Sequence, residues 1–279
     1  MGGVVKALVD AIPGHSFLDL RLGEVAHLGR IAGKTPPLWL MTSDSTDDAI
    51  REALGTRLDG DRVATFTQHL SLRLRPDGSL FLDGEGRPST HAPGHGDLPD
   101  ALRSSGLVSR FVASGGKVVT MANIDNLGGT LDPALVGFHL DHGKAVSCEV
   151  VDKLPSDRGG IPVRWNDRPV VLEEFRLPES FDPTTVPVFN TNTFHFDARA
   201  LASLAMEFTF FVAQKKVGSE PVIQFERLIG EVTSHLDSRF VRLPRAGEES
   251  RFLPVKDNTE LAERRAEIEL VARARGMIE

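Results

Sequence analysis

The residues most suited to chemistry gather in three short segments. In the first, Asn123, Asp125 and Asn126 come shortly after the predicted strand 117–121, Lys-Val-Val-Thr-Met. A carboxylate flanked by amides suits a hard cation such as Mg²⁺, and the same oxygens can bind sugar hydroxyls. The spacing is equally typical of an Asx turn in which Asp125 or Asn126 caps the next element. Both interpretations stay open at this point.

The second segment, residues 93–97, reads Pro-Gly-His-Gly-Asp. Glycines beside His95 would let the backbone approach a planar ligand that a Cβ would keep away. A plain surface turn has the same composition and is the alternative. His91 and His95 have a zinc-like spacing, but the intervening Pro-Gly disfavours a helix and no nearby cysteine completes a ligand set. The pattern therefore weighs against zinc.

The third segment, residues 251–256, reads Arg-Phe-Leu-Pro-Val-Lys and ends on Lys256. Only eight of the 32 basic residues are lysines, so a lysine that closes an apolar stretch is notable. A lysine ammonium is a compact point charge that suits a phosphate. The alternative is a solvated lysine on a loop.

Alternating strands and helices must position these segments. Apolar runs between turn residues predict strands, whereas apolar residues at helical spacing predict helices. The predicted strands are 38–41, 63–66, 117–121, 145–151 and 186–190, with a hairpin of 163–165 and 170–174 around Asn166-Asp167. The predicted helices are 16–28, 47–54, 98–104, 133–142, 198–211, 222–236 and 259–276. The alternation predicts an α/β sheet covered on both faces, and the hairpin indicates that the sheet is not purely parallel.

Composition and charge narrow the class of protein. The 279 residues carry 39 acidic and 32 basic side chains, a formal charge of -7, which argues against a nucleic acid as the main partner. A single cysteine, Cys148, excludes an internal disulfide framework. We find no apolar run long enough for a membrane helix and no signal-peptide pattern. We therefore expect a soluble, cytoplasmic protein that binds neither a nucleic acid nor a membrane.

Taken in order along the chain, the segments resemble the eukaryotic-type UTP–glucose-1-phosphate uridylyltransferase family, the UDP-sugar pyrophosphorylases. The hallmarks are residues 93–97, 123–128 (Asn-Ile-Asp-Asn-Leu-Gly), 189–192 (Phe-Asn-Thr-Asn) and 251–256, together with Gln68. Any one of these motifs is weak, but their shared order over nearly the whole chain is specific.

The resemblance implies a three-layer, nucleotide-binding α/β fold with a mixed, mostly parallel sheet, of the glycosyltransferase-A-like type. It implies that UTP and glucose 1-phosphate form UDP-glucose and pyrophosphate by in-line nucleotidyl transfer, with Mg²⁺ as cofactor. One alternative is another hexose 1-phosphate, such as N-acetylglucosamine or galactose 1-phosphate. A second alternative is a non-catalytic remnant that binds a nucleotide sugar.

The resemblance also implies roles for the residues that match the family's motifs. The nucleotide would be bound by Gln68, which reads the uracil edge, by Gly94, against which the uracil lies, and by Asn123, which holds ribose or sugar hydroxyls. The sugar phosphate would be bound by His95, Asn123, Asp125, Asn192 and, by a looser match, Glu173. Asp125 would also place Mg²⁺. Lys6 and Lys256 would be the catalytic lysines that neutralise phosphate charge from opposite sides.

The sequence departs from the family's pattern at three places. The family opens with a strand and a glycine-rich loop shortly before the lysine that matches Lys6, whereas this sequence starts at Met1-Gly2-Gly3. Ala92 stands where the family usually has a second proline. The family's C-terminal β-helix is not found. We expect residues 1–279 to be a catalytic domain truncated at its N-terminus, and we predict no oligomer.

Overall fold

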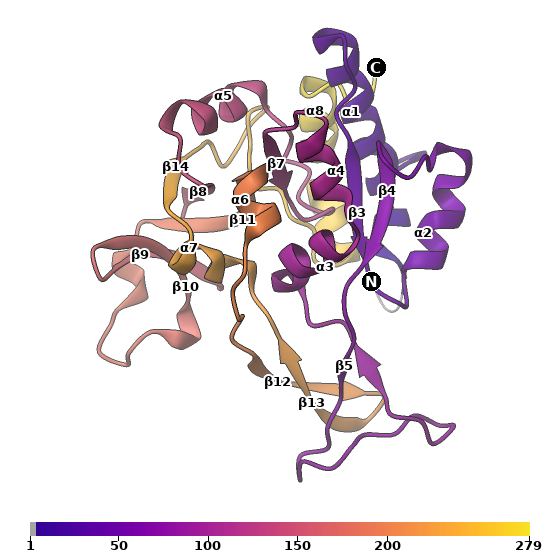
Figure 1. The fold of residues 1–279 in the computed structure, drawn as a ribbon, viewed down its shortest axis with the longest axis vertical. Coiled ribbons are helices and arrows are strands. Elements are labelled where there is room, and N and C mark those ends of the chain that lie inside the picture. Colours follow the sequence, from indigo (N-terminus) through magenta and orange to yellow (C-terminus); the bar gives the residue numbers. More distant parts are fainter. Residues whose placement is uncertain (1–3) are drawn as a thin grey trace.

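The computed structural model describes residues 4–279 as a mixed α/β protein. Its largest sheet has four strands in the order β14-β8-β11-β7 (Figure 1). These strands are β7 (Val118–Met121), β8 (Val146–Asp152), β11 (Val188–Asp197) and β14 (Ser238–Arg242). The pair β14-β8 is parallel, whereas β11 runs antiparallel to both of its neighbours. The predicted mixed sheet is confirmed; three strands share one direction, but only one of its three strand pairs is parallel.

A second, two-stranded sheet pairs β3 (Leu38–Thr42) with β4 (Val63–Thr67) in parallel. The helix α1 (Phe17–Ala32) precedes this sheet and α2 (Asp47–Leu54) connects its two strands. The start of α1 is set by local chemistry, because Ser16 and Asp19 form a reciprocal capping box that satisfies two backbone N–H groups.

Two large clusters of hydrophobic side chains are formed by different sets of helices. The first joins α3 (Leu98–Ser104), α4 (Leu107–Ala113) and α6 (Ala198–Ser203) to β7, β8 and β11, with Val108, Phe194 and Phe196 fully buried. The second joins α1 to the C-terminal helix α8 (Asn258–Ala274), with Phe17, Ile268 and Val271 at its centre. Of these two clusters, only the first includes residues of the four-stranded sheet.

Several further elements surround the sheets. They are β1 (Asp10–Ile12), β2 (His15–Ser16), β5 (Ser71–Leu72), β6 (Thr90–His91), α5 (Pro133–His142) and α7 (Val232–His235). A hairpin of β9 (Gly160–Trp165) and β10 (Arg168–Glu173) forms around Asn166 and Asp167, as predicted. Both turn residues have left-handed φ angles, 47° and 60°, which short polar side chains tolerate.

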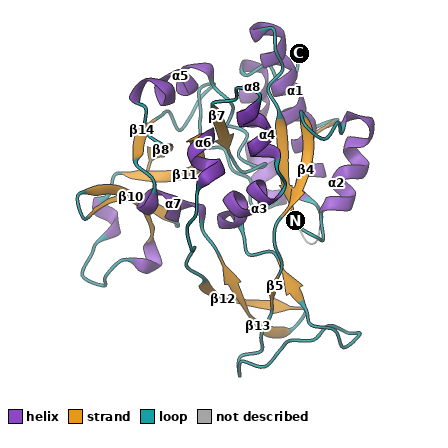
Figure 2. Ribbon diagram, in the orientation of Figure 1, coloured by secondary structure: helices purple, strands orange, loops and turns teal. Residues whose placement is uncertain are grey.

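Two helix predictions are wrong. The helix predicted over 198–211 ends at Ser203, and the region predicted as a helix over 222–236 begins as a strand. The strands β12 (Phe211–Val217) and β13 (Glu220–Glu226) lie in this region instead. They form an antiparallel hairpin that projects from the main body beside β5 (Figure 2). Ile223 also bonds to Leu74 through both backbone groups, so pairing with a distant segment overrides the local pattern.

None of the helices in the described part of the chain combines the length and hydrophobicity that crossing a bilayer requires.

Candidate active site

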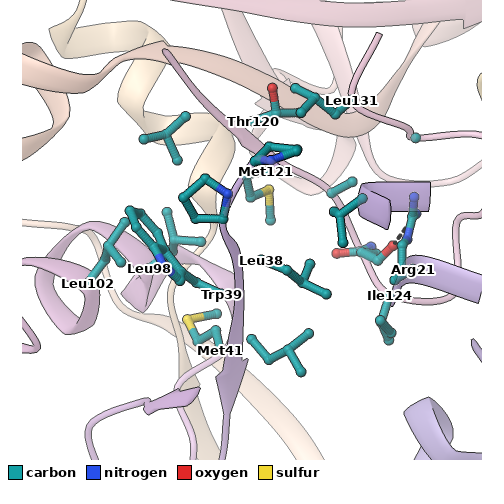
Figure 3. A pocket seen from close by; sticks show the side chains of 18 of the residues that line it. Arg21, Leu38, Trp39, Met41, Leu98, Leu102, Thr120, Met121, Ile124 and Leu131 are labelled. Atoms are coloured by element: carbon teal, nitrogen blue, oxygen red, sulfur yellow. Dashed lines mark hydrogen bonds between the residues drawn. The ribbon is translucent and has the colours of Figure 1, made fainter. Parts of the chain in front are cut away.

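A cavity of about 580 Å³ lies between β3 and β7 (Figure 3). Four of the site residues predicted from the sequence line it: Lys6, His95, Asn123 and Asp125. The rest of its wall is largely apolar. Gln68, Gly94, Glu173, Asn192 and Lys256 lie outside the lining, so the structure brings only part of the predicted site into this cavity.

Lys6 and Asp125 form the centre of the polar part. The Lys6 ammonium lies 2.7 Å from Asp125 Oδ2 and donates a second hydrogen bond to the carbonyl oxygen of Val255, at 3.0 Å. The side chain of Asp125 is 15% exposed and that of Lys6 is 33% exposed. Lys256 follows Val255 directly and is solvent-exposed. Lys6 therefore contacts the backbone of the residue that precedes Lys256, although the two predicted catalytic lysines are 250 positions apart in the sequence.

Asn126 joins the 123–126 loop to the 251–256 segment. Its amide nitrogen donates to the carbonyl oxygen of Arg251 at 3.2 Å, and its amide oxygen accepts from the Leu253 N–H at 2.8 Å. The Asn126 carbonyl accepts from the guanidinium of Arg21 at 2.5 Å. The Asx-turn interpretation does not hold for Asn126, because its side chain binds the backbone of a distant segment and not its own turn.

The side chains of Asn123 and Asn192 are hydrogen-bonded to each other. The Asn192 amide donates to Asn123 Oδ1 at 3.0 Å. Asn192 lies in a register irregularity of β11, with φ at 58°, and its N–H donates to Asn190 Oδ1 at 3.2 Å. Such an irregularity re-aims a side chain out of the ladder, and asparagine tolerates the left-handed backbone that this requires.

The 93–97 segment is held rigidly. Gly94 has a φ of 93°, which favours glycine, and its N–H donates to Gln68 Oε1 at 3.0 Å. A Cβ on Gly96 would lie 2.4 Å from the Arg227 carbonyl carbon, so only glycine fits this approach. The contact between Gln68 and Gly94 unites the two residues that the resemblance assigns to uracil.

The imidazole ring of His95 is neutral in this setting, and one of its two nitrogens carries a proton. Its Nδ1 accepts the backbone N–H of Ile229 at 3.0 Å. Burial lowers the pKa of His95 to about 4. A neutral ring that accepts at Nδ1 carries its proton on Nε2. His95 can therefore donate from Nε2 to a ligand oxygen without adding a positive charge.

Sequence reasoning missed the hydrogen-bond partners of Asp97, the last residue of this segment. Asp97, which is fully buried, accepts from the His69 N–H at 2.6 Å and from the guanidinium of Arg227 at 2.9 Å. Arg227 also contacts Asp100, at 3.0 Å. The histidine-glycine pattern could have drawn attention to Asp97, but nothing in the sequence links it to Arg227.

Glu173 lies apart from the cavity, at the end of β10. Burial and the neighbouring Glu174 raise the pKa of its carboxyl group. An ideal Cβ on Gly160 would lie 3.1 Å from Glu173 Oε1 and 3.4 Å from the Asn190 amide nitrogen. Glu173 is thus close to Asn190 and, through it, to the Asn192–Asn123 pair.

A buried charge network supports the 251–256 segment. Arg251, which is 1% exposed, donates to Glu149 at 2.6 and 2.8 Å and to the hydroxyl and carbonyl oxygens of Thr130. His195 Nε2 lies 2.8 Å from Glu149. Burial alone would raise the pKa of Glu149, but hydrogen bonds from His195 and Arg251 hold it below its ordinary value. None of these long-range partners could be read from the sequence.

Residues 4–279 contain no group of three or more His, Cys, Asp or Glu side chains placed to hold a metal ion. His91 Nε2 accepts the backbone N–H of Phe225 and His95 Nδ1 accepts that of Ile229, so both rings are engaged by the backbone. Met1-Gly2-Gly3, where the sequence departs from the family's pattern, lies outside the described residues.

Comparison with known proteins finds relatives that are similar over most of this chain. Curated relatives include the UTP–glucose-1-phosphate uridylyltransferases of Saccharomyces cerevisiae and Astragalus penduliflorus, each 28% identical over 92% of this chain. The match covers 54% of the yeast protein and 57% of the plant protein, so the chain spans little more than half the length of these relatives.

Solved structures agree in fold. The UDP-glucose phosphorylase of Trypanosoma brucei superposes with a TM-score of 0.78 at 26% identity, over 93% of this chain and 62% of that one. A UDP-glucose pyrophosphorylase variant of Leishmania major, solved with UDP-glucose, gives a TM-score of 0.77 at 24% identity, over 92% of this chain and 60% of that one. A sequence profile of the UTP–glucose-1-phosphate uridylyltransferases matches residues 1–269. The chain therefore belongs to the UTP–glucose-1-phosphate uridylyltransferase family.

Proposed function

We propose that this chain transfers a uridylyl group from UTP to glucose 1-phosphate, forming UDP-glucose and pyrophosphate. The observation that carries the proposal is the meeting of Lys6, Asp125 and the Val255–Lys256 segment from three distant parts of the chain. Membership of the family supports the same reaction.

The arrangement suits the chemistry of this reaction. An oxygen of the sugar phosphate attacks the α-phosphorus of UTP, and pyrophosphate leaves, so the protein need not supply a nucleophile. It must hold two anions in line and neutralise the charge that develops between them. Lys6 and Lys256 would provide positive charge from two sides, and His95 would donate a hydrogen bond from Nε2 without adding to that charge.

The neighbouring residues would select the ligands. Gln68 and Gly94 would bind the uracil, because the Gly94 N–H occupies Gln68 Oε1 and leaves the amide nitrogen to donate. The Asn123–Asn192 pair would bind sugar or ribose hydroxyls. Glu173 would contact the hexose from the side of Asn190.

We further propose Mg²⁺ as the cofactor, with Asp125 as its protein ligand. The residues fit this ion, because Mg²⁺ usually takes one or two carboxylates and completes its shell with phosphate oxygens and water. Asp125 Oδ2 faces Lys6, whereas Oδ1 accepts no hydrogen bond from residues 4–279. When bound, the ion would neutralise phosphate charge.

We also propose the finer fold assignment, the three-layer glycosyltransferase-A-like arrangement. It is supported by the first hydrophobic cluster, in which helices α3, α4 and α6 pack against strands of the mixed sheet.

The experiment is a pyrophosphate-release assay with UTP, Mg²⁺ and glucose 1-phosphate, run in parallel with N-acetylglucosamine 1-phosphate and galactose 1-phosphate. The matched control is Asp125→Asn, which keeps the size of the side chain and removes its charge. We expect UDP-glucose formation that falls by about a hundredfold in the control. UDP-glucose binding without turnover of any sugar phosphate would instead indicate a non-catalytic binding domain.

A further inference from the structure

Two charged side chains of opposite sign are buried on helix α1, whose other buried residues are apolar. Arg21 Nη1 donates to Glu24 Oε2 at 2.7 Å, and the two side chains are only 8% and 6% exposed. Taking such a pair out of water costs about as much free energy as the attraction returns, so a buried ion pair is a poor stabiliser. What this pair offers over an apolar one is therefore the geometry that its remaining polar atoms impose.

Those polar atoms bind one loop at both of its ends. The loop joins β7 to α5 and forms neither helix nor strand. Arg21 Nη2 donates to the carbonyl oxygen of Asn126 at 2.5 Å and lies 3.5 Å from that of Asn123. Glu24 Oε1 accepts the backbone N–H of Leu131 at 2.6 Å. The two side chains thus fasten the loop near its beginning and near its end.

The carbonyl groups that Arg21 contacts belong to the turn that carries Asp125. The Asn126 N–H bonds to the carbonyl oxygen of Asn123 at 3.1 Å, which closes a four-residue turn with Asp125 in its third position. The Gly129 N–H bonds to the carbonyl oxygen of Asn126 at 2.9 Å, so the next turn starts from the same group. A planar guanidinium can serve several such acceptors at once, because its donors are held in a fixed fork.

We propose that Arg21 and Glu24 are positioning residues for Asp125. They act through the backbone of the turn, and all three residues line the central cavity; Figure 3 shows Arg21 on its wall. The inference rests on the proposed uridylyl transfer, in which Asp125 binds the sugar phosphate and Mg²⁺. The Asp125 carboxylate bonds to Lys6, so its direction is set by that lysine and by the turn. Groups that orient a metal-binding side chain typically contribute about 10–100-fold to metal affinity or activity.

The main test removes both charges at once, in the double variant Arg21→Met with Glu24→Gln. Methionine keeps much of the apolar volume of the arginine, and glutamine keeps an oxygen that can accept the Leu131 N–H. Because no unpaired charge stays buried, the melting temperature should stay within about 5 °C of that of the unchanged chain. Arg21→Lys is the conservative variant. It keeps a charge beside Glu24, but one ammonium cannot replace the fork on the Asn123 and Asn126 carbonyls.

Hydrogen–deuterium exchange, followed residue by residue, measures the loop without using catalysis. In the double variant we expect the Asn126 and Gly129 amides to exchange about tenfold faster, the factor that corresponds to one lost charge-assisted hydrogen bond. The matched control is Arg245→Met with Asp157→Asn. That ion pair is also mostly buried, with side chains 19% and 10% exposed, but neither residue lines the cavity. Exchange of the two loop amides should be unchanged in the control.

Kinetics with UTP, Mg²⁺ and glucose 1-phosphate then separate positioning from a general loss of structure. In the double variant kcat should fall about tenfold or more, and the Mg²⁺ concentration that gives half the maximal rate should rise by a similar factor. The affinity for uridine, measured by calorimetry, should be unchanged, because Gln68 and Gly94 lie outside the cavity lining. A merely structural role would lower uridine affinity and melting temperature together with the rate.

Faster exchange of the loop amides together with a higher Mg²⁺ requirement supports the proposal. Unchanged exchange in the double variant, equal acceleration in the control, or faster exchange with unchanged kinetics overturns it. If the double variant does not fold, Arg21→Lys carries the same measurements. An unchanged chain that forms no UDP-glucose counts against the proposed function alone, and loop exchange then decides whether the pair holds the turn of Asp125.

Discussion

The substitution Arg251→Met tests whether the buried charge network holds the 251–256 segment in place. Arg251 is 1% exposed and donates two hydrogen bonds to Glu149 and two to Thr130. Methionine fills much of the same volume but leaves Glu149 buried with only His195 as a partner.

The expected cost follows from that unpaired charge. Removing one partner of a buried ion pair typically costs about 3–5 kcal/mol, because the remaining charge stays desolvated. The matched control is Arg242→Met. Arg242 bonds Asp152 at 2.6 Å, but both side chains are about three-fifths exposed, at 61% and 59%. An exposed pair contributes only about 0–1 kcal/mol.

The assay is urea denaturation followed by far-ultraviolet circular dichroism. We expect the free energy of unfolding to fall by about 3–5 kcal/mol for Arg251→Met and by less than about 1 kcal/mol for Arg242→Met. Adding Glu149→Gln to Arg251→Met should recover part of the loss, since the uncompensated charge is then gone. If Arg251→Met costs no more than Arg242→Met, the network does not stabilise this segment and the reasoning is refuted.

Three further predictions concern the site. Lys256→Ala should lower turnover about a hundredfold in the pyrophosphate-release assay, with an unchanged melting temperature, because the side chain is exposed; equal turnover would remove Lys256 from catalysis. The pKa of His95 is lowered to about 4, so the unfolded chain takes up its proton first as pH falls. The His95 contribution to stability is therefore complete above about pH 6.5 and declines toward pH 4, by up to about 1.4 kcal/mol per unit, and His95→Asn should flatten this decline in urea titrations across that range. Gly96→Ala should cost about 1–3 kcal/mol by thermal denaturation because its Cβ would meet the Arg227 backbone, whereas Gly84→Ala, in open space, should be nearly neutral; similar melting temperatures would contradict the packing argument.

Much of the fold follows from local signals. The helices at 47–54, 98–104 and 133–142 have the predicted limits, and the strands at 38–41 and 63–66 lie within one residue of theirs. These elements are set by apolar periodicity, capping residues and turn residues, which act over a few positions. The hairpin around Asn166-Asp167 was predicted for the same reason.

The wrong helix predictions over 198–211 and 222–236 show that local sequence signals do not determine every element. The apolar residues of the second region are compatible with either state, and pairing with residues 211–217 and with Leu74 made it a strand. That pairing lies outside any sequence window and could not be predicted from it.

The sequence by itself determined which residues are able to bind phosphate, sugar, uracil or a metal ion. Through the order of these residues it also determined the family to which the chain belongs. It could not place them. The tertiary structure decided that Lys6 meets Asp125 and Val255, that Asn123 meets Asn192, and that Glu173 lies outside the cavity. The physical reason is one of range: capping, turns and periodicity act between neighbours in sequence, whereas a site and a sheet edge are made by packing between distant segments.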